Sequence, residues 1–432
     1  MENSRVFKNA SWIIGCKIAQ SGFALVINAL TARYFGPSNY GLINYAASLV
    51  AFVTPVAMLG MTEVLVDELI DHSEREGEIL GTSIVMSVFS SILCLVGLGS
   101  FASIANRNDM TTPVVVALYS LLLISQSVEQ IQYWFHAKYL SKLVSIASLI
   151  AYFAVSLYKI GLLVYRKNIC WFAVSNSLDY LIIAVLLIHI YKHKGGQPLR
   201  FSWDASKLLW NKGKHYIIPG LMGLILAQSD RVMLRFMCGD TEVGYYSAAL
   251  AVAGLTSFVF SAIITSFRTL VLESKAVSQR KYEVNISKLY GIIVYLGLLQ
   301  CVFLTVFAKL SVQLMFGAEY LNAVNILYPV VWYTLFSYIG GVRAVCVLAE
   351  KKQRYLWIIS ASGMVLNIAL NLALIPIWKG FGAAIATTVT QFFTNIIMVY
   401  LIRPLRPNLV YIIKGLDLLS IFNLKSHKKG EI

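Results

Sequence analysis

Segments that are long and apolar enough to cross a lipid bilayer recur along the whole of this 432-residue chain. A transmembrane helix needs about 20 mostly apolar residues, whereas the strands of a membrane barrel alternate apolar and polar residues over about 10 positions. Twelve segments meet the helical requirement: residues 10–32, 40–61, 79–104, 113–135, 143–165, 169–191, 215–237, 243–267, 284–310, 320–348, 354–378 and 380–402. The sequence therefore predicts an all-α polytopic membrane protein with about 12 transmembrane helices.

The composition and the distribution of charge agree with this fold class. Only 13% of the residues are charged and 58% are hydrophobic, whereas a soluble domain of this length would carry charge over most of its surface. The net charge is +15, and most of the 36 lysines and arginines fall on the N-terminal side of the membrane if the spans alternate. Because cytoplasmic loops carry such an excess, we expect both termini in the cytoplasm. The basic face would meet anionic lipid, and no nucleic-acid partner is expected.

A polar connection divides the predicted spans into two groups of six. The domain prediction is an N-terminal bundle (1–191), a cytoplasmic linker (192–214), a C-terminal bundle (215–402) and a basic cytoplasmic tail (403–432). Apolar residues from Leu409 to Leu419 share one face of a helix in the tail, which predicts an interfacial helix.

A faint repeat relates the two groups of spans. Arg33 and Gly41 in the first group recur at nearly the same spacing as Arg235 and Gly244 in the second. Because six helices return the chain to its starting side, such halves would be related by an axis along the membrane normal. We expect a central cavity between them that carries the substrate.

The first span carries a polar stripe. Gln20 and Asn28 follow Lys17 at helical spacing in an otherwise apolar segment. Lys17 alone could extend its ammonium to the membrane surface, as lysines near helix ends do. That alternative leaves Gln20 and Asn28 unexplained, because a lipid-facing amide is unfavourable. The stripe is therefore predicted to face the cavity.

The seventh span carries a second polar group, formed by Gln228, Asp230 and Arg231. A charged side chain at the centre of a membrane helix costs about 2.5–3.5 kcal/mol on insertion scales, so each charge is a candidate for function. Adjacent residues point about 100° apart on a helix, so Asp230 and Arg231 are not explained as one local ion pair. Asp230 is also the candidate for coupling to a proton or sodium ion, a choice that the sequence leaves open.

Three further charges fall inside predicted spans of the first half: Glu129, Lys159 and Asp179. They are candidates for the cavity. A structural pair of Lys159 with Asp179, or of Lys159 with Glu129, explains them equally well.

Several kinds of site lack the residues that they need. The sequence contains no GxxxxGK[ST] phosphate-binding loop, no HExxH motif and no cluster of histidines and carboxylates. We therefore expect no catalytic residues, no metal site and no cofactor, and the protein is predicted not to be an enzyme.

Motifs along most of the chain carry a resemblance to a known family. They are NASWIIG, ARYFGPSNYGLINYAAS, QIQYWFHAK, DRVMLRF followed by VGYYSAA, and NIALNLALIPIWKGFGAAIAT. Their order resembles that of the Wzx-type flippases, members of the multidrug/oligosaccharidyl-lipid/polysaccharide (MOP) exporter superfamily. The resemblance implies a MATE-like, V-shaped pair of six-helix bundles around a cavity that opens alternately to either side. It also implies a location in the bacterial inner membrane.

The resemblance implies a substrate and partners as well. The substrate would be an undecaprenyl-pyrophosphate-linked oligosaccharide, moved to the outer leaflet for O-antigen, capsule or exopolysaccharide assembly. A polysaccharide polymerase and a chain-length regulator would be further partners, beside the membrane lipids. The related lipid II flippases have fourteen spans and cavity arginines that find no match here. The assignment of the pyrophosphate to Lys17 on one half and Arg231 on the other therefore comes from the residues themselves.

Two alternatives belong to other classes of protein. A MATE-like antiporter for small cations would share the fold and would need acidic cavity residues, for which Asp179 and Asp230 qualify. A membrane polysaccharide polymerase or glycosyltransferase would present a large outward loop with catalytic side chains, and the predicted outward loops are short.

Overall fold

The computed structural model describes residues 2–106 and 109–417, and the side chains before Gln20 lie outside this description. All regular secondary structure in the described residues is helical. The prediction of an all-α membrane protein is confirmed. Within the part of the chain that the structure describes, ten helices are long and apolar enough to cross a membrane, and two of them contain two predicted spans each. The ten helices therefore cover the twelve predicted spans.

Both of these double-span helices contain one residue with non-helical backbone angles. In α1 (Glu2–Ala57) that residue is Gly36, with φ 69° and ψ 175°. Pro37 follows, and a proline excludes the preceding residue from the α region, so glycine suits the position. In α14 (Leu356–Phe392) the residue is Lys379, with φ 50°. Each break falls where the sequence predicts a turn between two spans.

The described residues form two compact units. Unit 1 comprises residues up to Arg235 together with Gly239–Gly244, and unit 2 comprises Phe236–Cys238 and the residues from Tyr245 onward. Helix α8 therefore belongs to unit 1 as far as Arg235, whereas the predicted C-terminal bundle begins at residue 215. The two units are defined by which residues pack together, whereas the two predicted six-helix bundles are defined by the sequence repeat. The division into two bundles therefore stays a prediction.

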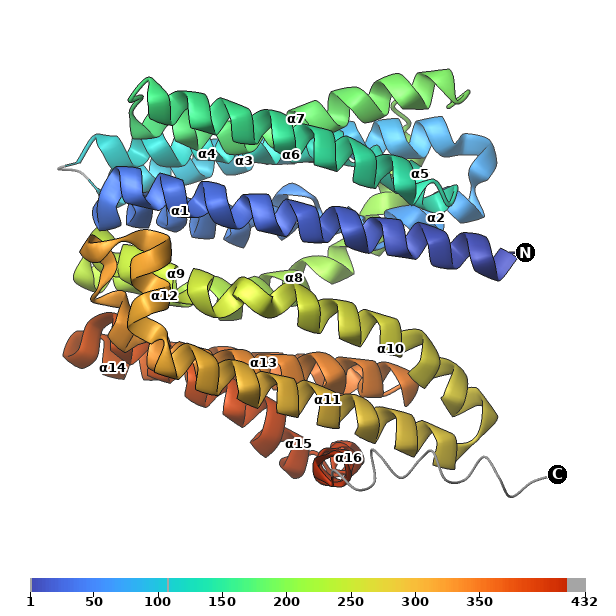
Figure 1. Ribbon diagram of the computed structural model, residues 1–432. Helices are drawn as coiled ribbons and strands as arrows, with labels where there is room; N and C mark the ends of the chain where they lie inside the picture. The colour runs from blue at the N-terminus through green and yellow to red at the C-terminus, as the bar shows by residue number, and fades with distance from the viewer. Residues whose placement is uncertain (1, 107–108, 418–432) are drawn as a thin grey trace. The chain divides into compact units, whose positions relative to one another are not determined.

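Unit 1 is built on long, nearly parallel helices. Helix α4 packs against α3 and α7, α7 packs against α6, and α1 packs against α4 and α6 (Figure 1). Its α-helices are α1 (Glu2–Ala57), α2 (Leu65–Asp71), α3 (Glu76–Ala105), α4 (Thr111–Glu129), α5 (Gln132–Ala137), α6 (Ser141–Val164), α7 (Ile169–His193) and α8 (Trp203–Cys238).

Two glycines bring backbones into direct contact in unit 1. A Cβ on Gly41 of α1 would overlap the carbonyl oxygen of Asp240, and a Cβ on Gly244 would overlap the carbonyl oxygen of Pro37. Gly41 and Gly244 are the glycines that the repeat relates. The close approach explains why both positions lack a side chain.

Unit 2 contains α9 from Tyr245 onward and the remaining helices. Helix α11 packs against α10, α13 and α16, and α13 packs against α14. The elements are α9 (Asp240–Ala253), α10 (Ser257–Val277), α11 (Gln279–Val306), α12 (Ala308–Phe316), α13 (Ala323–Ala349), α14 (Leu356–Phe392), a π-helix (Phe393–Ile397), α15 (Met398–Leu401) and α16 (Pro407–Leu416).

Helix α16 lies at the position of the predicted interfacial helix. It is seen end-on in Figure 1, whereas α11 and α13 are seen from the side, so α16 runs across them. Its Gly415 contacts the backbone of α11 at Ser287 and Gly291. Its Val410, Ile413 and Leu416 are exposed. The last predicted residue of that helix, Leu419, lies outside the described residues.

Candidate functional site

The first polar cluster of unit 1 joins α1 to α8. Gln228 Oε1 accepts hydrogen bonds from Arg231 Nη1 at 2.7 Å and from Ser48 Oγ at 3.1 Å. The hydroxyl of buried Tyr40 interacts with the Asn28 side chain and with the charge of Arg231. Asn28, Gln228 and Arg231 come from two predicted spans far apart in sequence, and the structure brings them together.

The second polar cluster of unit 1 joins α4, α6 and α7. Lys159 Nζ donates to Asn176 Oδ1 at 3.2 Å, and its charge interacts with that of Asp179. Glu129 is 7% exposed and experiences the like charge of Asp179. Of the two pairs that the sequence left open, the structure thus couples Lys159 to Asp179.

Two tyrosines lie within electrostatic range of both clusters. Tyr119 of α4 interacts electrostatically with Arg231 and with Tyr180 of α7. Tyr180 in turn interacts with Glu129 and Asp179. We call the polar residues of both clusters, together with these two tyrosines, the polar interior of unit 1. Its members are Asn28, Tyr40, Ser48, Tyr119, Glu129, Lys159, Asn176, Asp179, Tyr180, Gln228 and Arg231. It places cations, carboxylates and hydroxyls inside membrane-length helices, which suits a ligand with both a charge and many hydroxyl groups.

For the other residues that the sequence predicted, namely Lys17, Gln20 and Asp230, the structure gives less information about their contacts. Lys17 lies in α1, but its side chain lies outside the described residues. Gln20 is half-buried and Asp230 is 3% exposed. Arg231 and the helix of Lys17 both belong to unit 1, whereas the sequence places these two residues in the two halves of the repeat. Their role in binding stays a prediction.

Sequence reasoning missed Tyr40, Ser48, Tyr119 and Tyr180. Tyr40 and Ser48 lie eight residues apart on the second half of α1, with Asn44 between them at the same helical spacing, and Asn44 Nδ2 donates to the Tyr40 carbonyl at 2.8 Å. That second polar stripe was a readable signal. The two tyrosines give no such signal, because a tyrosine in an apolar helix usually packs in the core.

Arg235, one helical turn beyond Arg231, is held by a network of its own. Its guanidinium forms an ion pair with Asp240 and lies 4.0 Å from Asp109 Oδ2. It also lies over the ring of Tyr45, 5.7 Å from the centroid. Thr112 Oγ1 and the backbone N–H of Thr111 donate to the Asp109 carboxylate, which lowers the pKa of that group. Arg235 therefore fastens the end of α8 to the start of α4.

The interior of unit 2 contains neutral polar groups. Gln300 Nε2 donates to the Ala253 carbonyl at 2.9 Å, and Thr256 Oγ1 donates to Gln300 Oε1 at 2.7 Å. Asn371 Nδ2 donates to Asn367 Oδ1 at 3.1 Å. Half-buried Arg343, close to the end of α13, donates to the Thr394 carbonyl at 2.8 Å. Thr394 lies in the π-helix, whose irregular ladder leaves carbonyls accessible to a side-chain donor.

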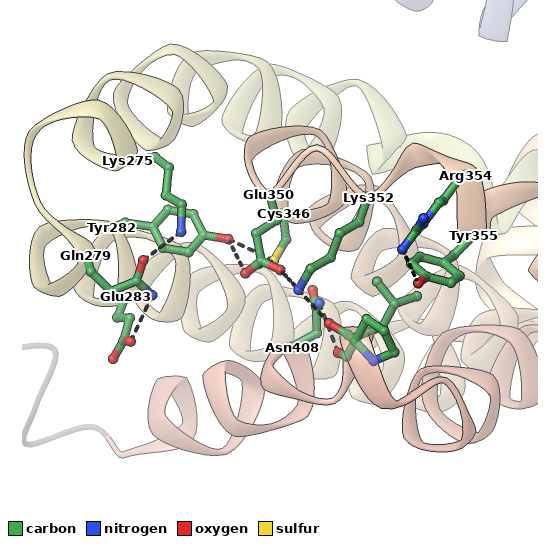
Figure 2. A network of polar contacts seen from close by, with 12 residues as sticks. Lys275, Gln279, Tyr282, Glu283, Cys346, Glu350, Lys352, Arg354, Tyr355 and Asn408 are labelled. Carbon is green, nitrogen blue, oxygen red and sulfur yellow. Dashed lines mark hydrogen bonds and ion pairs between the residues drawn. The ribbon is translucent and has the colours of Figure 1, made fainter.

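A charged network lies at one end of unit 2 (Figure 2). Tyr282 OH donates to Glu350 Oε1 at 3.1 Å and lies 2.9 Å from Cys346 Sγ. Lys352 Nζ donates to Glu350 Oε2 and to the Pro404 carbonyl, both at 2.5 Å. The network therefore links α11, α13 and the segment before α16.

The described residues contain no group of three or more histidines, cysteines or carboxylates that could hold a metal ion. The polar interior of unit 1 offers hydrogen bonds and fixed charge.

Comparisons with known proteins identify the class of fold. A multidrug resistance transporter of the MATE family, from the MOP superfamily, superposes with a TM-score of 0.64 at 12% identity, over 90% of this chain and 96% of the other. The lipid II flippase MurJ superposes with a TM-score of 0.64 at 16% identity, over 97% of this chain and 93% of the other. The fold is that of the MOP superfamily of membrane transporters.

The sequence identifies the family. The model of the polysaccharide biosynthesis protein family matches residues 6–271, which is more than half of the chain, so the chain belongs to this family. The capsular polysaccharide biosynthesis protein CapF of Staphylococcus aureus is 21% identical over 417 residues, covering 91% of this chain and 98% of CapF. The resemblance to Wzx-type flippases of the MOP superfamily is confirmed.

Proposed function

We propose that this protein is a flippase that moves an undecaprenyl-pyrophosphate-linked oligosaccharide repeat unit from the cytoplasmic to the outer leaflet of the bacterial inner membrane. The repeat unit would serve assembly of O-antigen, capsule or exopolysaccharide. The observation that carries the proposal is the family match over residues 6–271, together with the charged polar interior of unit 1. The similarity to CapF supports a polysaccharide substrate.

The chemistry of this substrate suits the polar interior of unit 1. A pyrophosphate with about two negative charges does not cross hydrocarbon unaided, and a fixed guanidinium can replace part of its hydration. Arg231 would bind the pyrophosphate, with Gln228 holding the guanidinium in place and Lys17 as a second cation. Asn28, Tyr40 and Ser48 would offer hydrogen bonds to sugar hydroxyls. Gln20 and Asp230 remain candidates for the same cavity.

The membrane potential favours the proposed direction. Each elementary charge that crosses the membrane changes free energy by about 2.3 kcal/mol per 100 mV, so two negative charges leaving a negative interior gain about 4.6 kcal/mol. Alternating access would need no nucleotide hydrolysis for this step. A proton or sodium ion coupled through Asp230 would add to that driving force, and a polymerase and a chain-length regulator would use the product.

The test is deletion of the gene in its native host followed by extraction of lipid-linked oligosaccharide. Loss of surface polysaccharide with accumulation of the repeat unit on the cytoplasmic side is the expected result. Complementation with the wild-type gene should reverse both effects. Normal surface polysaccharide without a trapped intermediate, in a host that lacks a second transporter of this family, would reject the proposal.

A cation antiporter is the second candidate, because Glu129 and Asp179 place carboxylates in the polar interior of unit 1. It would share the fold of the MATE transporter. This candidate predicts that deletion increases sensitivity to cationic drugs while surface polysaccharide stays normal. The flippase proposal predicts the opposite pair of results.

A further inference from the structure

A cavity of about 490 Å³ lies at the end of unit 2 where α10 passes into α11 and where α13 ends. Its walls include Lys275, Gln279, Glu350, Lys351, Lys352 and Tyr411. A water molecule occupies about 30 Å³ of liquid, so the cavity has room for a tetrahedral anion and several waters.

Two of the three lysines are held in place by neighbouring groups. Lys352 Nζ donates to Glu350 Oε2 and to the Pro404 carbonyl. Lys275 Nζ donates to Gln279 Oε1 at 2.6 Å and lies 4.5 Å from the centroid of the Tyr282 ring (Figure 2). Ordering a free lysine on binding costs entropy, and these contacts reduce that cost in advance.

The third lysine is available to a ligand. Lys351 is exposed, and its side chain has no hydrogen-bonding partner among the residues that the structure describes. Its backbone adopts φ 54°, in the turn that ends α13. Lys351 can therefore move toward a bound anion without giving up another contact.

The charge of the cavity is positive in sum. Three lysines face one carboxylate, that of Glu350, which already accepts from Lys352 and from the Tyr282 hydroxyl. The Glu350 carboxylate is therefore engaged on both oxygens. Lysine ammonium groups bind phosphate as compact point charges, and an anion in this cavity would meet three of them.

The surroundings place the cavity next to an amphipathic helix. Tyr411 and Pro407 of α16 contribute to its wall, while Val410, Ile413 and Leu416 of the same helix are exposed apolar residues. A helix of this kind lies at the level of the lipid head groups, with its apolar side toward the acyl chains. Phosphate groups of anionic lipids are concentrated at that level.

We propose that this cavity is a binding site for a phosphate group, carried by the head group of an anionic lipid or by a soluble phosphate. Lys275, Lys351 and Lys352 bind the phosphate oxygens, and Glu350 positions Lys352. The site lies in unit 2, apart from the polar interior of unit 1, and does not depend on the transported substrate.

The test uses the purified full-length chain in a neutral detergent. Short-chain phosphatidic acid, short-chain phosphatidylcholine and inorganic phosphate are titrated separately, and native mass spectrometry and thermal unfolding report binding. We expect one phosphatidic acid to bind and to raise the melting temperature, with little response to phosphatidylcholine. Saturation by inorganic phosphate at the same concentrations would assign the site to a soluble source, and a response to phosphatidic acid alone would assign it to lipid.

The variants separate this site from general surface charge. Lys351→Gln should weaken binding about fivefold, and Lys351→Gln with Lys275→Gln about 25-fold, from a contribution of about 1 kcal/mol per basic residue. Lys351→Arg should retain most of the affinity. Lys281 is an exposed lysine at the start of α11 and does not line the cavity, so Lys281→Gln should leave the affinity unchanged. Equal losses in Lys351→Gln and Lys281→Gln, or no binding of either phosphate compound to the wild type, would overturn the proposal.

Discussion

The two units differ in the kind of polar group that they place inside membrane-length helices. The polar interior of unit 1 contains ionisable side chains, among them Lys159, Asp179 and Arg231. The interior of unit 2 around Gln300 and Asn371 is neutral, and its charged groups, Arg343 and the pair of Glu350 with Lys352, lie toward the end of α13. Neutral hydrogen bonds between membrane helices stabilise their packing by a small amount each. A charged side chain inside the membrane has a free-energy cost that is several times larger than this gain. If the protein is the proposed flippase, we therefore expect its ligand contacts in unit 1 and packing contacts in the interior of unit 2.

The largest effect is expected from removing the Lys159 cation, whose charge acts on half-buried Asp179 in unit 1. Lys159→Met would leave the Asp179 carboxylate near Glu129 without its cation, and we expect a loss of about 3 kcal/mol in stability. Thermal unfolding in detergent and membrane abundance measure this loss. Lys309→Met, at an exposed lysine on α12, is the control and should change neither.

Adding Asp179→Asn to Lys159→Met sharpens the comparison. The double variant removes the unpaired charge and should recover most of the stability. If the double variant recovers its membrane abundance but does not transport, Lys159 and Asp179 have a functional role. Recovery of both abundance and transport would make this role structural, and the contrast between the units would then rest on Arg231.

The second effect concerns transport. Arg231→Gln should reduce delivery of surface polysaccharide at least tenfold at normal abundance, because a charge-assisted hydrogen bond to phosphate contributes about 1.5–3 kcal/mol. Arg231→Lys should keep part of the activity. Arg280→Gln, at an exposed arginine of α11, is the matched control. Surface polysaccharide and trapped repeat unit are measured together, and full activity of Arg231→Gln would contradict the assignment.

The third effect tests the neutral interior of unit 2. Gln300→Leu removes the hydrogen bonds to Thr256 and to the Ala253 carbonyl, and should cost about 1 kcal/mol of stability with transport retained. Unfolding and complementation assays report the two quantities. Loss of transport at normal abundance would show that unit 2 also contributes polar groups to the substrate path, which breaks the comparison.

The smallest effect concerns Asp109, at the start of α4. Its lowered pKa stabilises the folded state above the ordinary value of about 3.9, and this contribution is lost as the pH falls through the folded-state pKa. Because the side chain is 44% exposed, Asp109→Asn should cost less than about 1 kcal/mol at pH 7. The stability difference between wild type and variant should shrink below pH 4, and a difference that grows there would contradict the assignment.

The sequence predicted the spans and their breaks because both depend on local properties. Apolar length defined the helices, and Gly36 before Pro37 defined the first break. The repeat also pointed to Gly41 and Gly244, although their mutual contact is visible only in the structure. Arg33, the counterpart of Arg235 in the repeat, is exposed, so equivalent sequence positions do not have equivalent environments.

The partners of the polar residues could not be predicted in the same way. Arg235 lies 4.0 Å from Asp109, a residue more than a hundred positions earlier in the chain, and the charge of Arg231 on α8 acts on Tyr119 on α4. Such contacts depend on which helices pack together, and hydropathy carries no information about that choice. The assignment of α8 to unit 1 has the same origin, because α8 contacts Ser48 and Pro55 of α1 and the backbone at Gly60, just after α1.

The most direct test of the flippase proposal is transport in a defined membrane. The purified protein is reconstituted into vesicles that contain undecaprenyl-pyrophosphate-linked oligosaccharide from the native host, and the fraction accessible to an external sugar-binding probe is followed over time. For wild type and Arg280→Gln, the account predicts that probe access rises faster than in vesicles that contain the lipid-linked oligosaccharide without protein. For Arg231→Gln it predicts a rate near that of these protein-free vesicles. Equal rates for wild-type vesicles and protein-free vesicles would contradict the flippase proposal.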